Sequence, residues 1–206
     1  MKYFLAVMSL LFLTACNETG STGQSKGDGS ETGNNAEGRA PEFQEFLDQL
    51  PSIELPYTYL TCREGTEGSE VFGNHRETPY FKGYTHIRGW FPLDDGAVGV
   101  ISFAGADCML PVLTTFSADG TEMGKETICI GRCGPDPCFE CSEYTIIRED
   151  RSLYLADTAI TTECDNDFNP IPGGKIETKV LYQEGSIGGD GKISLSEDQS
   201  KVLSSE

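Results

Sequence analysis

Apolar and polar residues alternate along most of the chain after Pro56, and this period of two predicts β-strands. Asp-Gly pairs at 95–96 and 119–120 each separate two alternating runs, and that dipeptide is typical of tight hairpin turns. Further turns are expected at 149–151 and in the glycine-rich stretch 185–191. The strands that flank these four turns are expected at 80–91 and 97–104, 110–117 and 121–130, 142–148 and 152–161, and 175–182 and 192–195.

One segment before Pro56 has the period of a helix instead. It begins at Pro41 and stops at Pro51, and its apolar residues follow the spacing of one helix face: Phe43, Phe46, Leu47 and Leu50. Residues 41–206 are therefore expected to form a single, mainly β domain. We predict an antiparallel β-meander or sandwich of about eight to nine strands, with one short N-terminal helix.

The N-terminal residues have the composition of an export signal. A lysine precedes an apolar run at 4–13, which is far shorter than the roughly 20 residues that cross a bilayer. The run ends in Leu13-Thr14-Ala15-Cys16, which resembles the lipobox of bacterial lipoproteins. The resemblance implies removal of a signal peptide at 1–15 and acylation of Cys16. The alternatives are an ordinary signal peptide with an incidental cysteine, or a buried N-terminal strand.

The residues after the lipobox bear on the location of the protein. In Gram-negative lipoproteins an Asp after the acylated cysteine tends to imply inner-membrane retention, whereas this chain has Asn17. The resemblance therefore implies a lipid anchor in the outer membrane or at the cell surface. Residues 16–40 are rich in Gly, Ser and Thr and hold no aliphatic side chain larger than Ala, so we expect a flexible tether.

Acidic residues outnumber basic ones, with 33 Asp and Glu against 15 Lys and Arg and a formal net charge of −18. Neutralisation of phosphates by Lys and Arg supplies much of the affinity for nucleic acids, so neither DNA nor RNA is expected as a partner. The same charge disfavours adsorption to anionic lipid surfaces. A protein or a glycan stays open as the partner of the anchored domain.

The domain also holds seven of the eight cysteines of the chain. Export to an oxidising compartment predicts disulfides among them. Because seven is odd, one thiol is expected to be free or bonded to another chain unless all are reduced. The candidates for disulfides are Cys62, Cys108, Cys129, Cys133, Cys138, Cys141 and Cys164.

The expected hairpin registers limit which cysteines can form disulfides with each other. Extending the register about Asp119-Gly120 places Cys108 opposite residue 131, near Cys129 and Cys133. The turn at 149–151 places Cys164 opposite residue 136, between Cys133 and Cys138. We therefore expect a Cys108–Cys129 bridge, and a bridge from Cys164 to Cys138 or Cys133.

Metal and redox chemistry are the alternatives for the four cysteines at 129–141. Zinc sites of four thiolates usually use two Cys pairs separated by about 12 or more residues, whereas four residues part the two halves here. Pro135 and Pro137 also stiffen the connection, and no βαβ pattern surrounds the Cys-x-x-Cys at 138–141. Structural disulfides are the favoured interpretation, and no cofactor is expected.

The sequence carries no recognised catalytic motif: no nucleophile elbow, metalloprotease helix, Walker loop or dinucleotide fingerprint. His86 is expected within a strand, where a histidine usually makes a structural hydrogen bond. The alternative function is that of an exported hydrolase that acts through His86 or through a pair of carboxylates, which the sequence does not single out.

One expected strand carries side chains suited to binding. With strict alternation over 80–91, one face holds Tyr80 and the ligand-face candidates Tyr84, His86, Arg88 and Trp90. Their aromatic planes and polar tips could stack on a sugar or hold a peptide. The opposite face, with Phe81, Ile87 and Phe91, would then build the core. The alternative is that the helix or a loop buries both faces.

A metal candidate follows the last cysteine. Asp165, Asp167 and Asn169 match the start of a calcium loop. Pro170 stands where such a loop needs Gly, and Ile176 stands where it needs Glu, so a plain surface turn is the better interpretation.

These features together predict a membrane-anchored envelope lipoprotein with a recognition or structural role and no identifiable catalysis. The succession of lipobox, polar tether and cysteine-rich β-domain is similar to that of uncharacterised envelope lipoproteins of the Bacteroidota. That similarity covers the layout of the chain and implies no site residues.

Overall fold

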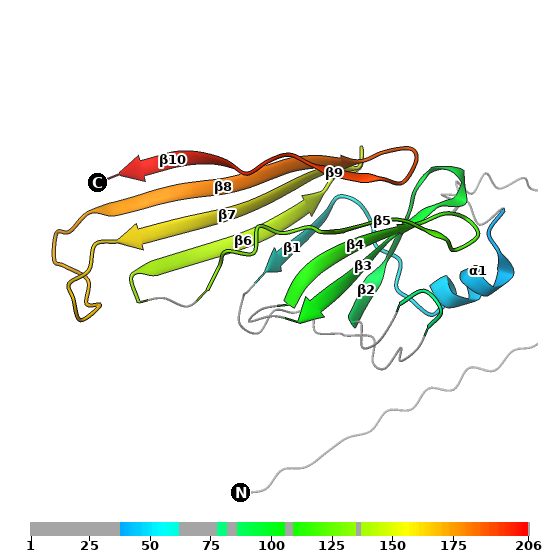
Figure 1. The fold of residues 1–206 in the computed structure, drawn as a ribbon, viewed down its shortest axis with the longest axis horizontal. Coiled ribbons are helices and arrows are strands. Elements are labelled where there is room, and N and C mark those ends of the chain that lie inside the picture. The colour runs from blue at the N-terminus through cyan, green and yellow to red at the C-terminus, as the bar shows by residue number, and fades with distance from the viewer. Residues whose placement is uncertain (1–37, 62–77, 82–85, 106–108, 135–136, 206) are drawn as a thin grey trace, which may run out of the picture. The chain divides into compact units, whose positions relative to one another are not determined.

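The computed structural model describes residues 38–61, 78–81, 86–105, 109–134 and 137–205. Within these ranges the chain is mainly β with one α-helix, as the sequence predicts, and it has ten strands in two antiparallel sheets where eight to nine strands were expected (Figure 1). The expected signal peptide, Cys16 and most of the tether lie outside the described residues. The elements are α1 (Pro41–Asp48), β1 (Tyr57–Thr61), β2 (His86–Pro92), the 3-10 turn η1 (Asp94–Gly96), β3 (Val98–Gly105), β4 (Met109–Phe116), β5 (Glu122–Thr127), β6 (Phe139–Ile147), β7 (Ser152–Thr162), β8 (Ile176–Ile187), β9 (Ile193–Leu195) and β10 (Gln199–Ser205).

Short turns place consecutive strands side by side. One sheet has the order β2-β3-β4-β5, and the other has the order β1-β6-β7-β8-β10, with β9 also paired to β8. The four expected hairpins all form: β2–β3, β4–β5, β6–β7 and β8–β9. β8 runs on to Ile187, which pairs with Ile193, so its hairpin turn is tighter than the glycine-rich stretch predicted. The alternating pattern did not single out β1 or β10.

The two sheets pack face to face, and the helix adds a third layer. Between the sheets, Phe91, Ile101 and Leu113 meet a group from β6 and β7 that consists of Ile147, Leu153 and Leu155. The other face of the four-stranded sheet packs on α1 through the expected helix residues Phe43, Phe46, Leu47 and Leu50. Burial of this apolar surface is the main stabilising contribution, at roughly 25 cal/mol per Å² removed from water.

The domain begins before Pro41, which corrects the expected tether boundary at residue 40. Arg39 is buried, and its Nε donates a hydrogen bond of 2.7 Å to the carbonyl oxygen of Gly96. Its guanidinium lies 5.0 Å from the centre of the Trp90 ring, a cation–π contact. The amide of Ala40 also donates to the carbonyl oxygen of Ala118. The sequence pattern missed these contacts because Arg39 stands among small polar residues typical of a linker.

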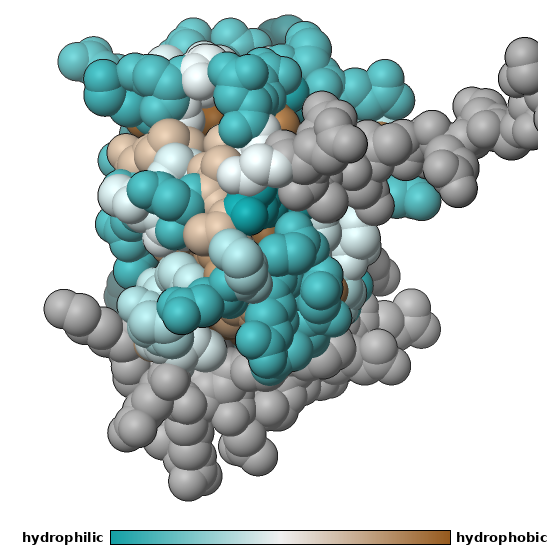
Figure 2. Space-filling view, turned by 90° about the vertical axis from the view of Figure 1, so that its right-hand side faces the viewer, coloured by the Kyte–Doolittle hydropathy of each residue, from teal (hydrophilic) through white to brown (hydrophobic). Residues whose placement is uncertain are grey.

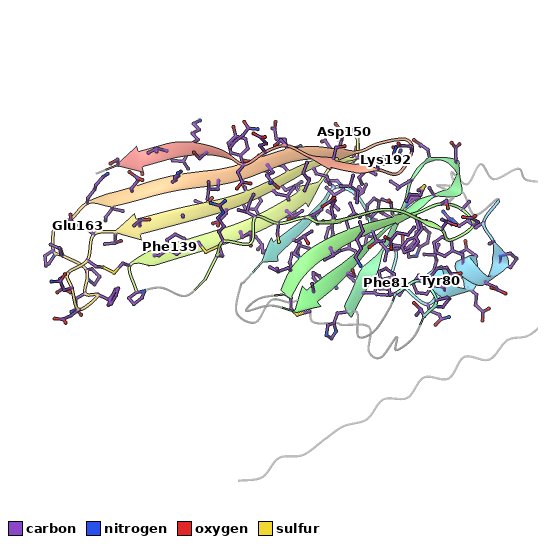
Figure 3. The ribbon with its side chains drawn as sticks, viewed as in Figure 1. Tyr80, Phe81, Phe139, Asp150, Glu163 and Lys192 are labelled. Atoms are coloured by element: carbon purple, nitrogen blue, oxygen red, sulfur yellow. A yellow bond between two sulfur atoms is a disulfide. The ribbon has the colours of Figure 1, made fainter. Side chains whose placement is uncertain are left out.

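The halves of β6, β7 and β8 that lie away from α1 extend past the four-stranded sheet (Figure 1). Phe139 and Glu163 mark that end of the domain, and Tyr80 and Phe81 mark the end near α1 (Figure 3). Residues 128–134, which we call the covering segment, leave β5 and run along the inner face of β6. There Thr145 donates a hydrogen bond to the carbonyl oxygen of Ile128.

The surface at the α1 end is mostly hydrophilic, with a small group of more apolar residues between the polar ones (Figure 2). In the part of the chain that the structure describes, no helix combines the length and apolar character needed to cross a membrane.

Candidate functional site

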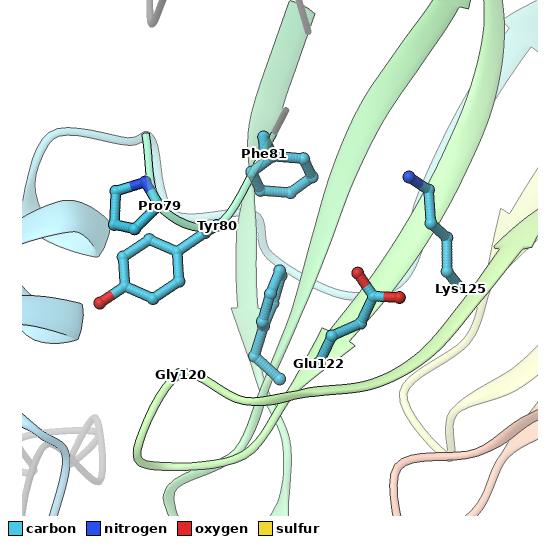
Figure 4. A pocket seen from close by; sticks show the side chains of 7 residues that line it. Pro79, Tyr80, Phe81, Gly120, Glu122 and Lys125 are labelled. Carbon is cyan, nitrogen blue, oxygen red and sulfur yellow. The ribbon is translucent and has the colours of Figure 1, made fainter. Parts of the chain in front are cut away.

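A pocket of about 360 Å³ opens beside α1, between the β4–β5 hairpin and the short segment 78–81 (Figure 4). Its volume is in the range typical of small-ligand sites. An aromatic wall stands on one side of the pocket and a charged wall on the other. The lining residues are Pro79, Tyr80, Phe81, Phe116, Gly120, Glu122 and Lys125.

The aromatic wall is fixed by the core beneath it. Phe81 and Phe116 are buried, whereas Tyr80 is half-buried and presents its ring to the pocket. The ring centre of Tyr80 lies 4.9 Å from that of Phe43 and 4.8 Å from that of Phe46, so α1 holds it in place. Burial, and then the nearby Glu42 carboxylate, raise the pKa of the Tyr80 hydroxyl, which therefore keeps its proton at neutral pH.

The charged wall comes from β5. Glu122 and Lys125 are exposed, and they are opposite Phe116 and Thr114 in the register with β4. Neither side chain forms an ion pair within the described ranges. A carboxylate that accepts hydrogen bonds and an ammonium that donates them therefore line the same pocket as the aromatic side chains, and neither is ion-paired among the described residues. This arrangement can bind a ligand that has one apolar face and several polar groups.

The predicted ligand face does not form, because β2 contains a bulge. Ile87 pairs with Ser102 and Gly89 with Ile101, which leaves Arg88 as an extra residue. The bulge reverses the alternation, so His86 and Trp90 lie on opposite faces of the sheet. Trp90 is buried under α1 and Arg39, which is the alternative that the sequence left open. Tyr84 lies outside the described residues, and His86 and Arg88 are half-buried.

The calcium candidate forms a surface turn. Oδ1 of Asp165 accepts hydrogen bonds of 2.9 Å from the backbone amides of both Asp167 and Asn169. Those bonds lower the pKa of the Asp165 carboxyl and hold the turn closed.

Four of the candidate cysteines form two disulfides, Cys133–Cys141 and Cys138–Cys164. The second is one of the two bridges expected for Cys164. It forms because the β6–β7 register continues to Phe139↔Thr161, which brings Cys138 and Cys164 to the same end of the hairpin. Cys62 and Cys108 lie outside the described residues.

The expected Cys108–Cys129 bridge is wrong, because Cys129 carries a free, buried thiol. The β4–β5 register holds as far as Val112↔Thr127, and the chain then leaves β4 to become the covering segment. Cys129 thereby moves to the inner face of the other sheet. Burial, and then the nearby Glu143 carboxylate, raise the pKa of the Cys129 thiol to about 12, so it is not a reactive thiolate at neutral pH.

A pair of carboxyl groups lies beneath the covering segment. Glu143 and Asp157 are direct partners in the β6–β7 ladder, and each side chain is 1% exposed. Glu143 accepts a hydrogen bond from the Gly131 amide, while its Oε2 and the Oδ2 of Asp157 have no hydrogen-bond partner in the part of the chain that the structure describes. Burial is the main cause that raises the pKa of both carboxyls, and the Asp157 charge further raises that of Glu143.

Asp157→Asn is expected to change how stability depends on pH. Because its native pKa is raised, the folded protein binds more protons than the unfolded chain between the ordinary and the native pKa. The free energy of unfolding therefore falls as the pH rises through that interval, by about 1.4 kcal/mol per unit of pKa difference. The variant should lose less stability between pH 4 and pH 8, as measured by urea denaturation.

Asp150→Asn is the matched control, because hydrogen bonds from Ser152 lower the pKa of the Asp150 carboxyl. Its stabilising contribution is present above the ordinary pKa and is lost in acid, so this variant should lose stability at neutral pH. Identical pH profiles for Asp157→Asn and the unmodified chain would show that Asp157 is not held in its protonated form.

The buried carboxyl pair is foreshadowed by the same hairpin register. The register that placed Cys164 near Cys138 also places Glu143 opposite Asp157, on the same inward face as Ile147 and Leu153. The pocket had no such signal, because Glu122 and Lys125 read as ordinary exposed charges and Phe116 as core.

Fold and pocket together define a class: an antiparallel β-sandwich with a helix on one outer face and an open aromatic–charged pocket at that end. Comparison with known proteins gives no match, whether with family models, curated proteins or solved structures.

Proposed function

We propose that this protein is an envelope lipoprotein, anchored through lipid on Cys16 in the outer membrane or at the cell surface, whose β-domain binds a partner. The lipobox at 13–16 and the polar tether after it support the anchor. The disulfides Cys133–Cys141 and Cys138–Cys164 suit an oxidising compartment outside the cytoplasm.

Cys16→Ser is expected to abolish acylation. In cells fed a labelled fatty acid, the unmodified chain should carry the label and fractionate with membranes, whereas the variant should carry essentially none. The intact mass of the extracted protein should correspond to a chain that starts at Cys16 with acyl groups attached. An unmodified chain that retains residues 1–15 in the soluble fraction would overturn the anchor.

The observation that carries the recognition role is the pocket, in which Tyr80 and Phe81 line one side and Glu122 and Lys125 line the other. A sugar ring has an apolar face that stacks on an aromatic plane, and its hydroxyls take hydrogen bonds from an ammonium or donate them to a carboxylate. We therefore infer that the partner is a glycan, bound at this pocket. The charged wall formed by Glu122 and Lys125 suits hydroxyl groups better than it suits an apolar ligand.

A glycan array with the soluble domain should identify a ligand, and calorimetry should then measure its affinity. Lys125→Ala and Glu122→Gln should each weaken binding about tenfold or more, because hydrogen bonds to charged groups contribute about 1.5–3 kcal/mol. Both side chains are exposed, so neither variant should unfold the domain. Lys201→Ala on β10 is the control and should bind normally. A glycan that binds both pocket variants unchanged would place the site elsewhere.

One observation favours the alternative function of a hydrolase, which is that Glu143 and Asp157 lie side by side in the β6–β7 ladder. Each is 1% exposed beneath the covering segment, where a substrate would have no access to them in this conformation. Recognition is therefore the function that the geometry supports better.

A further inference from the structure

A group of metal-ligating side chains lies beneath the covering segment, at the end of the domain away from the pocket. Cys133, Cys141 and Asp157 each bring one donor atom within 4.8 Å of the other two. Cys141 and Asp157 lie on the inner face of β6 and β7, and Cys133 belongs to the covering segment. Three donors from three separate parts of the chain therefore converge on one point.

The carboxyl group of Asp157 lies beside the sulfur atoms of Cys133 and Cys141, and neither sulfur can donate a hydrogen bond to it. Its Oδ1 lies 3.3 Å from the Sγ of Cys133, and a sulfur in a disulfide has no proton to donate. Its Oδ2 has no partner among the described residues, although the side chain is 1% exposed. Buried carboxyl groups normally have hydrogen-bond partners or bind a metal, and among the described residues no candidate donor atom other than the Cys133 sulfur is within reach of Asp157 while the disulfide is intact.

We propose that reduction of the Cys133–Cys141 disulfide converts this group into a zinc site, with Cys133, Cys141 and Asp157 as the ligands. A dithiol reductant supplies two electrons and two protons; the S–S bond breaks, two thiols form, and the reductant becomes a disulfide. Zinc then displaces the two thiol protons and is bound by two thiolates and one carboxylate. The cysteine pair thus alternates between a disulfide and a metal site according to the redox state.

The distances fit a tetrahedral ion with little movement of Asp157. Zn–S bonds of about 2.3 Å and Zn–O bonds of about 2.1 Å place a ligand oxygen about 3.6 Å from a ligand sulfur, and two ligand sulfurs about 3.8 Å apart. The oxygen–sulfur distance of 3.3 Å is already close to this value. The main change is the separation of the two sulfur atoms once their bond is broken.

The chemistry of the donors selects the metal. Thiolates favour zinc over magnesium or calcium, which prefer oxygen ligands alone. The fourth position of the ion is open to water or to the unpartnered Oε2 of Glu143, the ladder partner of Asp157. Arg132, which acts electrostatically on Asp157, offsets part of the negative charge of the ligands.

The second disulfide provides a matched control. Within the described ranges, no group of three ligating side chains includes Cys138 or Cys164. Reduction of the unmodified chain opens Cys138–Cys164 as well as Cys133–Cys141. The C138S/C164S variant, which lacks the Cys138–Cys164 bridge from the start, should keep the zinc site.

The test measures zinc binding by the full-length protein before and after reduction with a phosphine, by metal analysis after gel filtration. The oxidised chain should bind no zinc, and the reduced chain should bind one ion. D157N should weaken binding about tenfold or more, C133S/C141S should abolish it, and C138S/C164S should retain it. Glu140→Gln, on the outer face of β6, is the carboxylate control and should also retain it. With cobalt in place of zinc, the reduced chain should show a thiolate-to-cobalt charge-transfer band that C133S/C141S lacks.

Three results would overturn the proposal. The reduced chain could bind no zinc. It could bind zinc equally well in D157N and C133S/C141S, which would assign the ion to other cysteines. Reduction could also unfold the domain without recovery of its circular dichroism on addition of zinc. Because these readouts involve neither Cys16 nor the pocket, they are independent of the proposed function.

Discussion

Replacing Gly89 by alanine is expected to lower the free energy of unfolding by about 3 kcal/mol or more. Gly89 has a φ of +154°, a conformation that L side chains rarely adopt. A Cβ at this position would also overlap the carbonyl oxygen of Pro51, which accepts a hydrogen bond of 3.0 Å from the Trp90 amide. Alanine would therefore strain the bulge and push away the segment that connects α1 to the sandwich. Urea denaturation followed by the fluorescence of Trp90, the single tryptophan of the chain, measures the loss.

Gly173→Ala separates the two causes. Gly173 also has a positive φ, of +75°, but no atom lies within 4 Å of the Cβ that would be added. This variant should lose about 1 kcal/mol, which is the cost of the backbone conformation alone. Losses of equal size in the two variants would show that the contact between the added Cβ and the Pro51 carbonyl oxygen does not contribute to the destabilisation of Gly89→Ala.

Removing the Cys138–Cys164 disulfide by C138S/C164S is expected to destabilise the domain by about 3.5 kcal/mol. Its cysteines are 26 residues apart, whereas those of the Cys133–Cys141 bridge are 8 apart. The longer loop restricts the unfolded chain more, and the same loop-entropy relation gives about 2.5 kcal/mol for the shorter one. Thermal and urea denaturation of C138S/C164S and C133S/C141S should therefore rank the first variant as the less stable.

The structure of the unmodified chain adds a reason to expect this order. C133S/C141S places a serine hydroxyl near Asp157, where it can donate the hydrogen bond that the disulfide sulfur does not, and this should recover part of the loss. A larger loss of stability in C133S/C141S than in C138S/C164S would mean that the shorter bridge holds the covering segment in place in the folded protein, in addition to restricting the unfolded chain.

The hairpins could be predicted from the sequence because tight turns fix the register locally. The Asp119-Gly120 turn and the turn at 149–151 each gave pairings that the structure reproduces, such as Val112↔Thr127 and Ile147↔Leu153. The helix followed equally from its own spacing. In each case the deciding interactions lie within about 20 residues of chain, where a periodic pattern carries the information.

The predictions from the sequence failed where a single residue changes the strand register or the sheet against which a segment packs. Arg88 inserts one residue into β2 and so moves Trp90 to the other face, yet nothing in the alternation marks it. Cys129 lies two residues beyond the last pair of the β4–β5 ladder and packs against the other sheet. The pocket unites segment 78–81 with the β4–β5 hairpin, a contact between distant parts of the chain that local patterns do not specify.

The burial of Arg39 determines how a pull from the membrane would reach the domain. In a chain held at Cys16, the first hydrogen bonds of the described residues to bear the tension are those of Arg39 and Ala40, which bond to Gly96 and Ala118 in two separate turns of the four-stranded sheet. The load is therefore divided between two hairpins, and α1 is not peeled from its end until both attachments have broken. Mechanical resistance at the point of attachment thus resides in two residues whose neighbours in sequence resemble a linker.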